Sequence, residues 1–197
     1  MEFTRITFTK QEKEFIKEVA HIRTVVNERK NDIKAYGSVN KYMTKEELNI
    51  VSVVTEAGVV KAFGYDCTTT PLEIWPSFYL STHKGLYDGA DINHDGQAYE
   101  IRRVNNLKNP LAVRPKDVDH KAIVIKTFVP HEQIMDNGKV VGMTNYKPVV
   151  DIIGWVDAVE EWDNLEEPWW AKRQGTKDRV AEELKPFGLL LGQEVAA

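Results

Sequence analysis

The segment from Thr44 to Phe63 constrains the fold most, because its apolar residues cover nearly every face of a helix. Thr44 and Glu47 have the spacing of a capping box, and Gly64 is a typical helix stop, so both ends of the helix are predicted. A helix that is apolar all round has to be buried. Glu56 lies inside this apolar stretch, and a buried carboxylate is costly unless it is paired, hydrogen-bonded or bound to a metal. The rest of the chain therefore has to enclose this helix and supply a partner for Glu56.

An earlier amphipathic helix is predicted from Thr9 to about Arg29, with Thr9 and Glu12 as a second capping box. Strand patterns follow, with a turn between the second and third and a loop at Asn137-Gly138. The strands are expected at 71–80, 85–92, 97–105, 111–114, 121–129 and 149–156. We expect a loop or lid at 160–175. For residues 178–191 we expect a short strand followed by a helix at 182–184. This order predicts an α/β (α+β) fold with a mixed central β-sheet flanked by helices.

The length of 197 residues predicts a single domain, residues 1–197. Within it we expect N-terminal helices at 9–63, a sheet core at 71–157, and a lid and C-terminal segment at 158–197. No apolar run approaches the roughly 20 residues that a membrane span needs, and the first residues lack the apolar core of a signal peptide. We therefore expect a cytoplasmic protein with no membrane partner.

Charge and cysteine content exclude two classes of protein. The single cysteine, Cys67, cannot form an internal disulfide or a cysteine-based zinc site, so we interpret it as a small apolar residue. The net charge of −4 argues against a high-affinity, non-specific nucleic-acid coat protein, because phosphate neutralisation drives such binding. It does not argue against an enzyme that has a local basic patch.

The sequence Asp95-Gly96 is a strong tight-turn signal, and it predicts a hairpin that brings Asp91 and Glu100 close together across the two strands. Two carboxylates in one place repel, so the pair favours a cation, and a hard divalent ion such as Mg²⁺ prefers oxygen ligands. Because strand residues alternate between faces, Arg102 lies on the same face as Glu100. The hairpin therefore predicts a metal-assisted site for a phosphoryl group.

Two short motifs, Gly89-Ala90-Asp91 and Tyr99-Glu100-Ile101-Arg102, resemble the core of the PD-(D/E)XK nuclease-like superfamily. The wider layout, with Gly154-Trp155 near the end of a late strand, is similar to small nuclease-like proteins of phage genomes. The resemblance implies a restriction-endonuclease-like core, a virus-encoded protein of the host cytoplasm, and Mg²⁺- or Mn²⁺-dependent hydrolysis of DNA or RNA.

In that scheme, Asp91, Glu100 and Arg102 are catalytic, and Asp91, Glu100 and Glu56 hold the metal. Arg102 stands where the superfamily has a lysine. An arginine binds phosphate through two hydrogen bonds, but it stays protonated and therefore does not act as a base. Lys126 is the first candidate to supply the missing lysine, and we expect Arg103, Lys108 and Lys126 to bind substrate.

Two alternatives remain open at this stage. The first is a catalytically inactive nuclease-like phage accessory protein that binds a host protein or nucleic acid. The absent lysine and the acidic, tryptophan-bearing segment at 157–170 favour it. The second is a purely structural role, in which Glu100 and Arg102 form surface ion pairs and Glu56 bonds Arg102.

Overall fold

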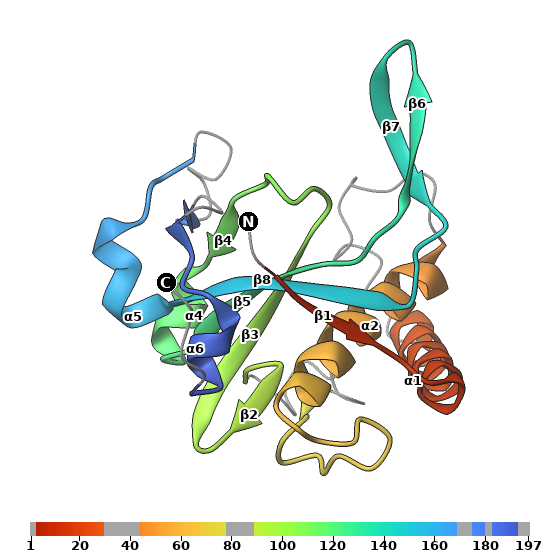
Figure 1. The fold of residues 1–197 in the computed structure, drawn as a ribbon, viewed down its shortest axis with the longest axis horizontal. Coiled ribbons are helices and arrows are strands. Elements are labelled where there is room, and N and C mark those ends of the chain that lie inside the picture. The colour runs from red at the N-terminus through yellow and green to blue at the C-terminus, as the bar shows by residue number, and fades with distance from the viewer. Residues whose placement is uncertain (1–2, 30–43, 78–88, 169–174, 180–182, 193–197) are drawn as a thin grey trace.

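A central five-stranded mixed sheet organises the computed structural model, which describes residues 3–29, 44–77, 89–168, 175–179 and 183–192 (Figure 1). Its strand order is β1-β8-β5-β3-β2, and only β3 and β5 are parallel to each other. The bounds are β1 Thr4–Thr7, β8 Val149–Asp157, β5 Ile123–Phe128, β3 Gln97–Val104 and β2 Ile92–His94. The predicted mixed sheet with flanking helices is confirmed.

Two long helices, α1 (Lys10–Arg29) and α2 (Lys45–Ala62), pack together against one face of this sheet. Both predicted capping boxes are present. The Thr9 amide donates to Glu12 at 2.6 Å and the Glu12 amide to the Thr9 hydroxyl at 3.2 Å, and Thr44 and Glu47 repeat the arrangement. α2 is buried on nearly all sides, as its sequence predicts. It approaches β8 so closely that a Cβ on Gly58 would lie 2.9 Å from a Val150 methyl carbon.

The other face of the sheet carries a smaller second core, formed by Leu111, Val113, Val124, Val156, Ala158 and Leu165. The elements around it are β4 (Leu111–Val113), α4 (Pro115–Asp119), α5 (Ala158–Glu161), the 3-10 helix η1 (Trp162–Asn164) and β9 (Lys177–Arg179). β4 pairs with β9, and the chain from β4 through α4 makes the crossover that a parallel β3–β5 pair requires.

Some predicted elements differ from those in the structure. The segment expected to be a loop or lid begins with α5 and η1, and the last helix described is α6 (Phe187–Leu190) rather than 182–184. The predicted strand at 71–80 is wrong over its described part, because residues 72–74 form a turn and no strand runs through 71–77. Residues 78–80 of that strand, residues 85–88 of the strand predicted at 85–92, and residue 182 of the predicted helix lie outside the described residues. β1 was not predicted, because only Ile6 marks it as a half-buried strand.

A second hairpin, formed by β6 (Glu132–Asp136) and β7 (Lys139–Thr144), projects from the body as an arm (Figure 1). Asn137 and Gly138 at its tip both have positive φ, at 47° and 75°, as a tight hairpin turn requires. The sequence predicted this turn as a loop but not the strands beside it. Four of the five β6 residues are exposed, so β6 lacks the apolar alternation of a half-buried strand.

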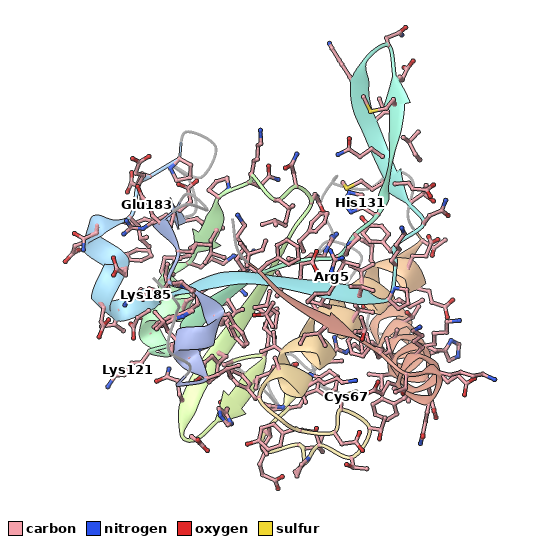
Figure 2. The ribbon with its side chains drawn as sticks, in the orientation of Figure 1. Arg5, Cys67, Lys121, His131, Glu183 and Lys185 are labelled. Carbon is pink, nitrogen blue, oxygen red and sulfur yellow. The ribbon has the colours of Figure 1, made fainter. Side chains whose placement is uncertain are left out.

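Cys67 lies in the loop after α2 and is buried (Figure 2). Burial, and after it the charges of Glu12 and Asp66, raise the pKa of this thiol to about 11. A thiol with so high a pKa is a poor nucleophile, which agrees with its interpretation as a small apolar residue. Among the described helices, none has the length and apolarity to cross a membrane.

Candidate functional site

The hairpin of β2 and β3 brings Asp91 and Glu100 together, as the sequence predicts. Ile92 pairs with Tyr99, so the register places the preceding Asp91 beside Glu100. The Asp91 carboxylate accepts a hydrogen bond from the Ile101 amide at 2.8 Å, and the Ser77 hydroxyl donates to the Asp91 carbonyl at 3.0 Å. These two bonds fix both the side chain and the backbone of Asp91.

Both carboxylate oxygens of Glu100 are held by cations. Oε2 accepts from Arg102 at 2.6 Å, and Oε1 accepts from Lys116 at 2.8 Å. Burial alone would raise the pKa of this nearly inaccessible carboxyl, but the charges and hydrogen bonds of Arg102 and Lys116 outweigh it and lower the pKa. Lys116 itself is 44% exposed, so it is the partner that can leave most easily.

Arg102 links Glu100 to a second acid, Asp117, through a 2.7 Å ion pair. The other Asp117 oxygen accepts from the Arg114 amide at 2.8 Å, which fixes Asp117 at the start of α4. The Arg102 Nε atom is buried and has no hydrogen-bond partner among the described residues. A buried N–H without an acceptor is unusual in proteins, so this atom can still bind an oxygen of a water molecule or ligand.

Like charges crowd in two parts of this cluster. Burial, followed by the negative charges of Glu56 and Glu100, raises the pKa of Asp91 to about 7. On the cationic side, burial, followed by the charge of Arg102, lowers the pKa of Arg114. A cation beside Asp91 and an anion beside Arg102 and Arg114 would each relieve part of this repulsion.

Glu56 has partners other than the predicted metal. Arg23 binds it with two hydrogen bonds of 2.9 and 2.6 Å, and Trp75, Ser77 and Ser52 donate three more at 2.8, 2.6 and 3.1 Å. Burial raises the pKa of this carboxyl, but these partners, above all the charge of Arg23, lower it below its ordinary value. Its oxygens are therefore occupied, and the described residues contain no group of three or more His, Cys, Asp or Glu side chains that could hold a metal ion.

The three residues predicted to bind substrate lie in different places. Lys126 is fully buried and stands opposite Arg102 in the parallel register, on the same face of the sheet. Its ammonium donates to the Leu107 carbonyl at 2.8 Å. Arg103 lies on the opposite face of the sheet, where it bonds Asn105 at 2.8 Å and lies over the ring of Tyr146. Lys108 is exposed in the turn after β3. Only Lys126 therefore shares the face of Glu100 and Arg102.

Arg114, Lys116 and Asp117 complete the cluster, although none of them was predicted to belong to the site. The sequence offers a partial signal, because Arg114 and Lys116 belong to a basic stretch and Asp117 follows Pro115, which is typical of the first turn of a helix. Only the crossover from β4 through α4 to β5 brings this turn against Arg102.

Comparisons with family models, curated proteins and solved structures gave no match for this chain.

Proposed function

We propose that the chain is a Mg²⁺- or Mn²⁺-dependent phosphodiesterase that hydrolyses nucleic acid at the cluster of Asp91, Glu100 and Arg102. The observation that carries the proposal is that the hairpin places Asp91 beside Glu100, next to Arg102, whose buried Nε–H has no acceptor among the described residues. Asp91 is crowded by other carboxylates, and Arg114 is crowded by the Arg102 guanidinium. A divalent cation and a phosphate group bound side by side would relieve both kinds of crowding.

The donor set fits a magnesium-type ion if Glu56 is left out. Mg²⁺ is commonly held by one or two carboxylates, with water and substrate phosphate completing its coordination. Asp91 can supply one carboxylate, and Glu100 can supply the second if the half-exposed Lys116 leaves its Oε1 atom. Glu56 is a poorer donor, because both of its oxygens are bonded to the buried Arg23. When bound, the ion would neutralise phosphate charge and make a water molecule more acidic.

The side chains of the protein would then bind and orient the phosphodiester. Burial lowers the pKa of Arg102, but the charges of Glu100, Asp117 and Asp91 outweigh it and raise the pKa, so Arg102 stays a cation and accepts no proton. Its unpartnered Nε–H can donate to a phosphate oxygen. Glu56 acts as a support, because the Ser77 hydroxyl lies 2.6 Å from its carboxylate and 3.0 Å from the Asp91 carbonyl and shares its one proton between these two acceptors.

A relationship to the PD-(D/E)XK nuclease-like superfamily is part of this proposal. Its support is a hairpin with an acid before one strand and Glu-x-Arg on the next, followed by a crossover to a parallel strand. Lys126, on that parallel strand, remains the candidate for the missing lysine. A phage origin is proposed on the same resemblance.

One observation favours a second function, a catalytically inactive protein that binds nucleic acid or a host protein. Arg102 and Lys116 already neutralise Glu100, and a metal ion would have to displace at least one of them. If they stay in place, the cluster is an ion-pair network that can bind a phosphate at Arg102 and Arg114 without cleaving it.

Cleavage of plasmid, single-stranded DNA and single-stranded RNA in Mn²⁺ tests the proposal. We expect cleavage by the wild type and a loss of about 100-fold or more in Asp91→Asn and in Glu100→Gln, since even indirect metal partners contribute about 10–100-fold. The matched control is Asp119→Asn, an exposed acid on α4 outside the cluster, which should cleave normally. No cleavage by folded wild-type protein, with salt-dependent nucleic-acid binding that Arg102→Gln weakens, would favour the second function instead.

A further inference from the structure

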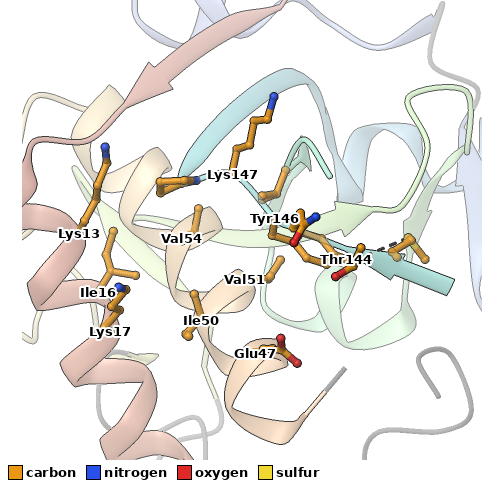
Figure 3. Close-up of a pocket in the computed structure, with 14 residues that line it drawn as sticks. Lys13, Ile16, Lys17, Glu47, Ile50, Val51, Val54, Thr144, Tyr146 and Lys147 are labelled. Carbon is orange, nitrogen blue, oxygen red and sulfur yellow. Dashed lines mark hydrogen bonds between the residues drawn. The ribbon is translucent and has the colours of Figure 1, made fainter. Parts of the chain in front are cut away.

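A cavity of about 410 Å³ lies between α1, α2 and the segment that leads from β7 into β8 (Figure 3). Its apolar lining comes from α1 and α2, from Met143 in β7, and from the residue after β5, namely Ile16, Ile50, Val51, Val54, Met143 and Val129. This volume is within the range of small-molecule sites in proteins, about 300–1,000 Å³. The cavity therefore has room for the apolar part of a small molecule.

The charged side chains around this cavity are mostly cationic. Lys13, Lys17 and Lys147 line it, and none of the three forms an ion pair with any residue that the structure describes. Glu47 is the one acid in the lining, and its carboxylate is engaged by Thr44 in the helix cap at 2.7 and 2.9 Å. In Figure 3 the ends of Lys13 and Lys147 lie away from Glu47, and Lys17 lies on the α1 side of the cavity, so the cations are spread around its rim.

We propose that this cavity binds a small amphipathic anion, with an apolar chain or ring against the valines and one acidic head at the lysine-bearing rim. A neutral ligand would leave the ammonium groups without a counter-charge, and a cationic ligand would be repelled by them. An apolar ligand would contact the apolar lining, but only an anion would also neutralise the lysines at the rim of the cavity. The chemical class that meets both conditions is a medium-chain or aromatic carboxylate.

This cavity is separate from the cluster around Glu100. Alternation along β3 puts Glu100 and Arg102 on the face of the second core, whereas Tyr99 and Ile101 face the helices. The cavity belongs to the helix side, because Ile16, Val51, Val54 and Val129 are all members of the core on that side. Binding here can therefore be tested whether or not the chain cleaves nucleic acid.

Calorimetry of the full chain with decanoate and with decylamine tests this proposal, since the two probes share an apolar chain and differ in charge. We expect one decanoate per chain, bound at least about tenfold more tightly than decylamine. The double variant Lys13→Glu with Lys147→Glu should weaken decanoate by about tenfold, because two favourable charges become unfavourable. Lys10→Glu makes the same kind of charge change on α1 outside the cavity and should leave the affinity unchanged.

Equal affinity for the two probes, or no binding of either, would overturn the proposal. So would an equal loss in Lys10→Glu and in the double variant, because binding would then follow net charge rather than the cavity. Circular dichroism of each variant separates loss of folding from loss of binding.

Discussion

Arg23→Met should destabilise the fold strongly, because it leaves the buried Glu56 carboxylate without its only cation among the described residues. The Arg23 and Glu56 side chains are 1% and 6% exposed, so water cannot replace the guanidinium. Breaking a buried ion pair typically costs 3–5 kcal/mol. Glu56 keeps the hydrogen bonds from Trp75, Ser77 and Ser52, so we expect the lower end of that range, about 3 kcal/mol.

Urea unfolding followed by tryptophan fluorescence measures this cost, and its pH dependence tests the reason for it. In the wild type the pKa of Glu56 is lowered, so the contribution of Glu56 to stability is present above its unfolded pKa and is lost as pH falls. In Arg23→Met, burial raises that pKa, and protonation relieves the unpaired charge. The cost should therefore shrink between pH 7 and pH 4.

The control is Lys10→Met on the same helix, where the ion pair with Glu14 is 3.9 Å long and exposed. Its loss should cost less than about 0.5 kcal/mol. A cost below about 1 kcal/mol for Arg23→Met, or the same cost at pH 4 and pH 7, would refute the assignment of Glu56 as a buried, ionised partner of Arg23.

Three further changes probe the site and its support. Because the folded pKa of Asp91 is raised to about 7, ionising Asp91 destabilises the fold as pH rises from about 4 to 7. The free energy of unfolding of Asp91→Asn should therefore be about 1–2 kcal/mol higher than that of the wild type in urea between pH 5 and pH 8. This figure is reduced from what the pKa shift implies, because Asp91 is partly exposed. Lys116→Met frees one Glu100 oxygen and should tighten Mn²⁺ binding several-fold in calorimetry. Gly154→Ala should lower stability in thermal melts by about 1–3 kcal/mol, because its Cβ would lie 2.8 Å from Leu184 Cβ and from the Lys185 carbonyl oxygen.

Local patterns in the sequence predicted the elements that a few neighbouring residues determine. α1 and α2 begin at their capping boxes, and Asp95-Gly96 produces the hairpin that pairs Asp91 with Glu100. These features need contacts only a few residues apart, so spacing alone reveals them. The arm of β6 and β7 was not predicted, because four of the five β6 residues are exposed and β6 lacks apolar alternation.

The partners of the charged residues could not be predicted in this way. Glu56 was expected to need a partner, but Arg23 lies 33 positions before it and Ser77 lies 21 positions after it. Asp117 reaches Arg102 only because α4 packs beside β3 after the crossover. Such pairings depend on tertiary packing. The residues next to a charged residue in the sequence do not show which partner it will have in the fold.

The proposed metal site requires that Asp91 and Glu100 together hold a divalent cation. Calorimetric titration with Mn²⁺ at pH 7, in two buffers that differ in ionisation enthalpy, tests it most directly. Because the pKa of Asp91 is about 7, binding should release roughly half a proton at pH 7 and almost none at pH 8.5. Asp91→Asn should abolish both binding and proton release. The proposed metal site would be wrong if folded wild-type protein bound no Mn²⁺, or if Asp91→Asn bound Mn²⁺ as tightly as the wild type.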